Sequence, residues 1–242
     1  MKTLHPAFRQ IDHRPWPLPE TKWIWKQRWD NLLFLHWPIE VKEIRDLIPA
    51  ELDVDTFDGM AWLAIVPFDM KGVTKRGWPA PKLFCDFPEI NVRTYVKIGG
   101  KPGVWFFSLD ITSGLGVWVA RNFFNLPYFK AKIDVNVPGN EINYFHERGA
   151  KVFDATYVPG EFVTFEPGSF ESWSTERYSL YSQSKSGTLF RGEVHHPKWP
   201  LQHADLAVRR NTLLDEFNVG ERHPSILFSK SLDVVVFPLE RL

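Results

Sequence analysis

Turn-forming residues divide this sequence into short segments, and their spacing is typical of a β-rich protein. Nineteen prolines and fifteen glycines interrupt the 242 residues, which fits many short strands better than a helical bundle. The pairs Gly99-Gly100, Pro159-Gly160 and Ser186-Gly187 each stand between two neighbouring strand candidates, closely enough to predict antiparallel hairpins. We therefore expect a mainly β (α+β) fold.

The segments between these turns predict the secondary structure. Aromatic residues make up 15% of the chain and favour strands. The strand candidates are residues 61–66, 90–98, 104–111, 129–137, 152–158, 162–165, 175–182, 188–195 and 226–237. Apolar residues at helical spacing predict three helices, at residues 39–48, 115–124 and 204–217. Because no repeat or linker divides the chain, we expect one domain over residues 1–242, with the proline-rich residues 1–20 as an extended arm.

Charge and cysteine content exclude several classes of function. The 29 Lys and Arg residues balance the 29 Asp and Glu residues, so nothing favours binding to nucleic acid or to an anionic membrane. A single cysteine, Cys85, cannot form an internal disulfide or a cysteine-rich zinc site. The first residues lack the apolar core of a signal peptide, and no apolar run approaches 18 residues. We therefore expect a cytoplasmic protein.

The candidate strand at residues 89–98 carries most of the functional information. A period of two places these polar side chains on one face: Glu89, Asn91, Arg93, Tyr95 and Lys97. That face is either a solvated outer surface or the polar lining of a barrel interior, in which Arg93 pairs with a carboxylate ligand. The residues alone leave these two interpretations nearly even.

The next strand candidate contains an acid in apolar surroundings. Ser108 and Asp110 share one face of this otherwise apolar segment. A buried carboxylate must be paired or have a raised pKa. We favour a structural role in which Asp110 pairs with Arg93 across a hairpin, and the alternative is an acid or base in a pocket. Farther along, Arg177 or Glu176 is expected to face Arg191 or Glu193 in surface ion pairs.

Known catalytic and cofactor motifs are missing from the sequence. It contains no G-x-S-x-G, no glycine-rich phosphate loop, no H-E-x-x-H and no G-x-G-x-x-G, so we expect no cofactor. The adjacent His195 and His196 point to opposite faces of a strand, which makes a metal site unlikely to form. His36 lies in an apolar run and is interpreted as a core histidine.

Several segments together resemble the YqjF-like family, whose members are largely uncharacterised. They are Leu35-His36-Trp37-Pro38, Thr56-Phe57-Asp58-Gly59, the stretches 87–96 and 103–110, Leu126-Pro127-Tyr128-Phe129, Thr175-Glu176-Arg177-Tyr178 and the stretch 192–197. The resemblance extends over nearly the whole chain. Through it, the chain is similar to proteins with the acetoacetate decarboxylase fold. This implies a cone-like antiparallel β-barrel with an internal cavity and about three covering helices.

The resemblance also implies that this chain does not use the Schiff-base mechanism of the decarboxylases. The decarboxylases form a Schiff base through the first lysine of a Phe-Pro-Lys-Lys segment. The corresponding segment here is Leu126-Pro127-Tyr128-Phe129, so Tyr128 stands at the Schiff-base position and Phe129 at that of the second lysine. Neither side chain can form an imine. The acidic residue of the superfamily maps onto Glu89, which favours the interpretation of the polar strand face as a cavity lining.

Three hypotheses of function follow. The first is a protein that binds a small oxo acid or aromatic molecule through Arg93, Glu89, Asn91, Tyr95 and Tyr128. The second is an enzyme of lyase, isomerase or hydrolase type that works without an imine. In it, Glu89 or Asp110 is the base and Tyr128 or Arg93 stabilises an enolate. The third is a structural role as a homo-oligomer, because exposed aromatic residues mark interfaces.

Overall fold

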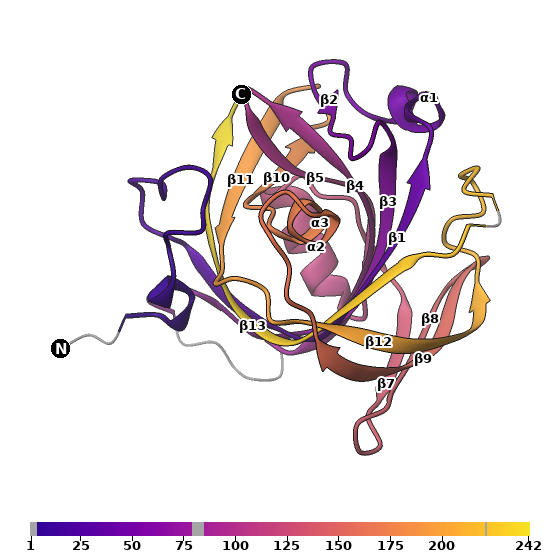
Figure 1. Ribbon diagram of the computed structural model, residues 1–242. Coiled ribbons are helices and arrows are strands. Elements are labelled where there is room, and N and C mark those ends of the chain that lie inside the picture. Colours follow the sequence, from indigo (N-terminus) through magenta and orange to yellow (C-terminus); the bar gives the residue numbers. More distant parts are fainter. Residues whose placement is uncertain (1–3, 79–84, 221) are drawn as a thin grey trace.

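The chain forms a closed barrel of seven strands in the computed structural model, which describes residues 4–78, 85–220 and 222–242 (Figure 1). The barrel strands, in spatial order, are β1 (Trp25–Ile39), β3 (Ala61–Lys75), β4 (Phe87–Ile98), β5 (Lys101–Ile111), β10 (Ser179–Gln183), β11 (Leu189–His195) and β13 (Ser225–Arg241). Pairing of β13 with β1 closes the ring. Each neighbouring pair is antiparallel except β5 and β10, which are parallel, so the barrel is mixed rather than purely antiparallel.

A second layer of strands covers part of the outside of the barrel. It consists of β12 (Leu201–Asn211), β9 (Lys151–Phe162), β8 (Ile142–Arg148) and β7 (Lys132–Asn136), and it is joined to the barrel where β12 pairs with β13. Two short strands, β2 (Asp53–Val54) and β6 (Tyr128–Lys130), pair with β4 and β5. The described apolar core therefore has two large parts, one inside the barrel and one between the barrel and this outer layer, and a small third cluster beneath the N-terminal arm.

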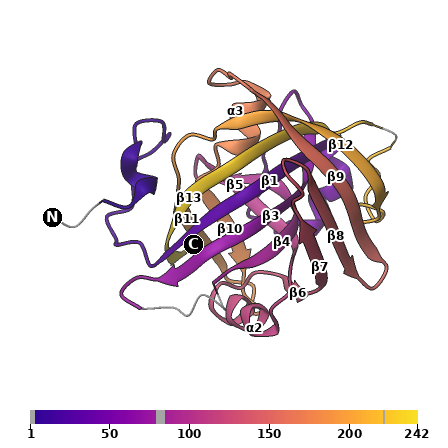
Figure 2. The same cartoon turned by 90° about the horizontal axis from the view of Figure 1, so that it is seen from below.

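The helices are short. They are η1 (Pro6–Arg9), α1 (Val41–Ile44), η2 (Arg45–Leu47), α2 (Gly114–Phe123) and α3 (Phe170–Thr175). α2 and α3 overlap near the barrel axis in Figure 1 and lie far apart in Figure 2, so they sit at opposite ends of the barrel. Ser113 starts α2 by accepting a hydrogen bond from the backbone N–H of Gly116, at 3.1 Å from Oγ.

The N-terminal arm lies against β11 and β13. Its residues 4–20 include the helix η1 and are therefore not extended throughout. Arg14 Nη2 donates to Glu193 Oε2 at 2.8 Å, and Trp16 Nε1 donates to the same oxygen at 2.9 Å. His13 Nε2 lies 2.9 Å from the carbonyl oxygen of His196. These contacts join the arm to β11 and to His196, the residue that follows it.

Two of the three predicted hairpins are confirmed, and the third is wrong. Gly99-Gly100 connects β4 to β5, and Ser186-Gly187 lies in the turn between β10 and β11. Pro159 and Gly160, however, lie inside β9, because β12 pairs with β9 on both sides of this point, with a register shift between Gln202 and Ala204. Predicted residues 129–137 form two strands instead of one, and the predicted strand at 175–182 begins only at Ser179, because α3 occupies its start.

The predicted helix at residues 204–217 is wrong. Residues to Asn211 belong to β12, which pairs with β9, and residues 213–216 form a turn. The predicted helix at 115–124 is confirmed as α2, and that at 39–48 is reduced to α1 and η2. The strands β1 and β8 and the helix α3 were not predicted.

Candidate functional site

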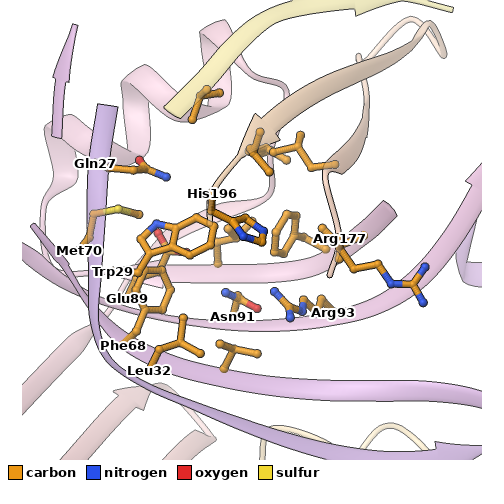
Figure 3. A pocket seen from close by; sticks show the side chains of 18 of the residues that line it. Gln27, Trp29, Leu32, Phe68, Met70, Glu89, Asn91, Arg93, Arg177 and His196 are labelled. Carbon is orange, nitrogen blue, oxygen red and sulfur yellow. The ribbon is translucent and has the colours of Figure 1, made fainter. Parts of the chain in front are cut away.

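A cavity of about 110 Å³ lies inside the barrel, and its lining includes Leu126, which follows α2, and Thr175, which ends α3. Its apolar wall belongs to the inner core and includes Leu32, Val66, Phe68, Val104 and Trp199. Its polar lining is formed by Gln27, Trp29, Glu89, Asn91, Arg93, Tyr128, Thr175, Arg177, Ser179 and His196. Figure 3 shows Asn91 and Arg93 beneath Trp29 and His196, and Arg177 at one side. A few polar groups within an apolar wall are typical of small-molecule sites.

Strand β4 brings three of the predicted residues together. Its period of two turns Glu89, Asn91 and Arg93 toward the cavity, while Ile90 and Val92 pack in the outer core. The other two polar residues of the face lie elsewhere. The fully buried Tyr95 hydroxyl lies 2.6 Å from His36 Nε2, and Lys97 Nζ lies 3.3 Å from Asp55 Oδ1 near the surface. His36 is a fully buried core histidine.

Glu89 and Tyr128 form a hydrogen-bonded pair at the cavity wall. The Tyr128 hydroxyl donates to Glu89 Oε2 at 2.9 Å. Burial raises the pKa of Glu89 from 4.5 to about 7, although the hydrogen bonds from Tyr128 and Asn91 oppose the shift. Burial and the neighbouring carboxylate also raise the pKa of Tyr128 well above its usual range. At neutral pH Glu89 therefore exchanges readily between its charged and neutral forms, as a general acid or base must.

Arg93 presents a cation to the cavity without a carboxylate partner among the described residues. Its guanidinium carbon lies 5.5 Å from the centre of the Phe34 ring and 5.8 Å from that of Tyr95. Its Nε atom is buried and has no hydrogen-bond partner in the described part of the chain. A guanidinium held by rings in this way keeps its donors available for a carboxylate.

Asp110 does not pair with Arg93, which corrects the expectation from the sequence. Its Oδ2 atom accepts hydrogen bonds from His146 Nε2 at 2.6 Å and from Arg148 Nε at 2.8 Å. The register of β4 and β5 places Asp110 opposite Ile90, on the outer face, whereas Arg93 points inward. Asp110 is also not among the described residues that line the cavity, so it is not in position to act there as a base.

Several polar atoms of the lining are buried without a partner among the described residues. They are Trp29 Nε1, Asn91 Oδ1, Arg93 Nε, Arg177 Nη2 and Ser179 Oγ. A buried polar atom without a partner is costly, and folded proteins satisfy nearly all of them. Five such atoms around one cavity make it the candidate functional site.

Sequence reasoning missed the contribution of Arg177 and His196 to this lining. Arg177 does not face Arg191 or Glu193, because its Nη1 atom donates to Asp55 Oδ2 at 2.5 Å. His196 is buried, and burial lowers its pKa to about 4, so its ring is neutral at physiological pH. A signal was present, since both residues lie in segments that carry the family resemblance.

A family model describing an uncharacterised conserved protein, DUF2071, matches residues 26–233. The YqjF protein of Bacillus subtilis strain 168, also described as uncharacterised, is 38% identical over 230 residues, which cover 93% of this chain and 95% of YqjF. The chain belongs to the DUF2071 family. The resemblance to the YqjF-like family, predicted from the sequence, is thereby confirmed.

Solved structures show that this DUF2071 protein has the acetoacetate decarboxylase-like fold. The enduracididine biosynthesis enzyme MppR in complex with pyruvate superposes with a TM-score of 0.67 at 10% identity, covering 91% of each chain. An acetoacetate decarboxylase-like enzyme from Sphingomonas wittichii RW1 gives 0.63 at 12% identity, covering 95% of this chain and 97% of that enzyme. Acetoacetate decarboxylase from Legionella pneumophila superposes with a TM-score of 0.63 at 11% identity, covering 100% of this chain and 97% of the decarboxylase.

The described residues of this DUF2071 protein form neither a cluster of metal ligands nor a helix that could span a membrane. Within residues 4–78, 85–220 and 222–242, no group of three or more His, Cys, Asp and Glu side chains is arranged to hold a metal ion. Among these described residues, every helix is too short or too polar to cross a membrane.

Proposed function

We propose that this protein binds a small oxo acid or aromatic acid in the cavity of the barrel. The observation that carries the proposal is Arg93, a cation that faces the cavity with a buried Nε and no carboxylate partner among the described residues. A carboxylate would fill that place with charge-assisted hydrogen bonds, and Asn91, Ser179 and Trp29 offer further polar atoms. MppR, which shares the fold, is described in complex with pyruvate.

The size of the cavity sets the scale of the bound group. A volume of about 110 Å³ is that of a small-molecule cavity with room for several water-sized groups. Such a space fits the head of a small acid, namely a carboxylate with an adjoining carbonyl group. The apolar residues around it exclude water and strengthen the attraction between Arg93 and a carboxylate.

The described lining also supports binding without an imine. It contains no lysine, and the group at the wall beside Glu89 is the phenol of Tyr128. An imine requires an amine nucleophile, which a phenol cannot replace. We therefore propose that a bound oxo acid is held by hydrogen bonds and charge alone.

A second candidate function, proton-transfer catalysis, is favoured by the pair of Glu89 and Tyr128. A carboxylate with a pKa of about 7 can take a proton from the carbon beside a carbonyl group and return it to that carbon. During this step Arg93 would balance the charge of the enolate, and the Tyr128 hydroxyl would hold Glu89 in place. Glu89 is then the catalytic base.

The binding proposal is tested with Arg93→Ala. We expect pyruvate and phenylpyruvate to raise the melting temperature of the wild-type protein and to leave that of Arg93→Ala unchanged. Without a ligand, the two proteins should melt within a few degrees of each other, because Arg93 has no ion-pair partner to lose among the described residues. Arg93→Lys, which keeps the charge but not the fork of donors, should retain part of the effect. Equal stabilisation of wild type and Arg93→Ala would contradict the proposal.

The catalytic candidate requires a different measurement. Exchange of the methyl protons of pyruvate for deuterium, followed by proton NMR, reports removal of a proton from carbon without need of a further reaction. We expect wild type to accelerate this exchange with an apparent pKa near 7 and Glu89→Gln to abolish it. If Glu89→Gln exchanges as fast as wild type while Arg93→Ala fails to bind, the protein binds acids without this catalysis.

A further inference from the structure

A second and larger hollow lies outside the barrel, beside α2. This outer groove has a volume of about 1120 Å³, ten times that of the inner cavity. Its floor includes Trp105 and Phe107 from the outward face of β5, and its sides include Trp118 of α2 and the turn between β10 and β11. Trp118 is 58% exposed.

The outer groove and the inner cavity share part of their described lining. Phe106 and Leu126 line both spaces. Phe106 belongs to β5 and is partly buried, and Leu126 lies in the loop between α2 and β6.

The opposite end of the barrel is filled by rings. Phe170 and Trp173 of α3 pack on Trp62 and Tyr95, with ring centroids 4.2 Å and 4.7 Å apart. Arg177, which follows α3, is held there by its ion pair with Asp55. A molecule in the cavity that is too long for it therefore extends toward Phe106 and Leu126 rather than toward α3.

The described lining of the outer groove combines aromatic rings with uncharged polar side chains, and its charged members are the cations Arg121 and Lys185. The rings of Trp105, Phe107 and Trp118 offer a surface on which an aryl group can stack. The Arg121 guanidinium already lies 4.8 Å from the centre of the Phe129 ring, so this cation is engaged with the aromatic surface.

We infer that the outer groove is the second half of the binding site and holds a ring-bearing tail of the acid whose carboxylate lies at Arg93. The inference rests on the proposed function and narrows its ligand to arylalkyl oxo acids. The acid head fills the inner cavity, the chain passes between Phe106 and Leu126, and the aryl group lies against Trp118. Burial of the ring supplies affinity that the small head group alone does not reach.

Calorimetric titration of the full-length protein tests this assignment with a series of probes. The probes are pyruvate, 2-oxo-4-phenylbutanoate and 2-oxo-6-phenylhexanoate, each titrated into wild type, Trp118→Ala, Trp78→Ala and Arg93→Ala. We expect the longest acid to bind wild type about tenfold tighter than pyruvate, because burial of its tail removes additional apolar surface from water. Trp118→Ala should lose most of this gain and leave the affinity for pyruvate unchanged.

The variant Trp78→Ala is the matched control. Trp78 is 68% exposed and is not part of the described lining of either space, so its removal should leave the whole series unchanged. If all acids bind wild type equally through Arg93 and Trp118→Ala has no effect, the tail site is refuted and the proposed function stands. If Arg93→Ala binds every acid as wild type does, or no acid binds wild type, the proposed function fails together with the tail site.

Discussion

Among single residues, Glu89 allows a prediction about the pH dependence of stability that needs no knowledge of the ligand. Its side chain is almost fully buried, and its pKa in the fold is about 7 against 4.5 when unfolded. Between these values the folded state holds a proton that the unfolded state has released, so this group lowers stability as the pH rises from 4.5 to 7. The whole loss amounts to about 3 kcal/mol. Glu89→Gln keeps an acceptor for Tyr128 and cannot ionise, so above pH 7 it should be more stable than wild type by about that amount.

Denaturant unfolding at pH 5 and at pH 8 measures the difference in free energy of unfolding between Glu89→Gln and wild type. At pH 5 we expect the gap between Glu89→Gln and wild type to be small, and at pH 8 to be near its full size. The exposed Glu147 on β8 serves as the control, because Glu147→Gln should shift stability little and equally at both pH values. A constant gap between Glu89→Gln and wild type at both pH values would show that Glu89 does not titrate in this range.

At the scale of elements, the seam between β5 and β10 depends on Gly103. A Cβ atom at this position would lie 2.5 Å from the carbonyl oxygen of Ser179 and 2.7 Å from a ring carbon of Tyr181. These two strands form the parallel pair of the barrel, and Ser179 lines the cavity. We expect Gly103→Ala to lower the free energy of unfolding by about 1–3 kcal/mol, as overpacking of a core does, and to weaken the binding of acids.

Gly114→Ala is the matched control for this element. Gly114 begins α2, and its nearest contact for a new Cβ is Lys130 Cδ at 3.8 Å, which is an ordinary distance. Alanine favours the helix over glycine, so this variant should be as stable as wild type or slightly more so. Equal stability of Gly103→Ala and Gly114→Ala, measured by denaturant unfolding, would contradict the tight seam.

The elements also show what the sequence pattern can predict. Hairpins with a local turn signal, such as the one at Gly99-Gly100, were found, because two strands joined by a short turn need few distant contacts. β1 was missed, because Leu32 to Leu35 are buried on both faces between the two cores and show no alternation. β12 was mistaken for a helix because pairing with β9 overrides the helical preference of its Ala, Leu and Arg residues.

At the scale of the whole molecule, the candidate site combines residues that no local pattern connects. The sequence of one strand predicts that Glu89, Asn91 and Arg93 share a face. Whether that face points into the barrel depends on closure of the barrel by β1 and β13. Arg177 reaches the lining through a contact with Asp55, 122 residues away in the chain. Such pairings are set by tertiary packing, and a single sequence does not display them.

The same long-range packing governs the response of the whole molecule to acid. Phe8 of the arm stacks on the fully buried His195, with ring centroids 5.3 Å apart, and burial is the main cause that lowers the pKa of His195 to about 4. His196 is lowered to about 4 as well, also mainly by burial. Below pH 6.5, their pKa in the unfolded chain, both histidines bind a proton in the unfolded state but not in the folded state. Both therefore reduce the free energy of unfolding as the pH falls from 6.5 to 4. Burial also lowers the pKa of His5 and His36 and raises that of Glu176. Glu89 and Glu176 act in the opposite direction to the histidines, but the four histidines outnumber them.

We therefore expect the wild-type protein to lose stability between pH 7 and pH 4.5, and His195→Phe to lose about 2.4 kcal/mol less over the same interval. Phenylalanine keeps the stacking on Phe8 and removes the titrating group, so the variant should match wild type at pH 7 within about 1.5 kcal/mol. Unfolding in guanidinium chloride at pH 4.5, 5.5 and 7 gives the free energy of unfolding of each protein at the three pH values. His203→Gln, at an exposed position of β12, should follow the wild-type curve throughout. If His195→Phe also follows that curve, the arm does not hold His195 in its neutral form, and acid sensitivity must arise elsewhere in the molecule.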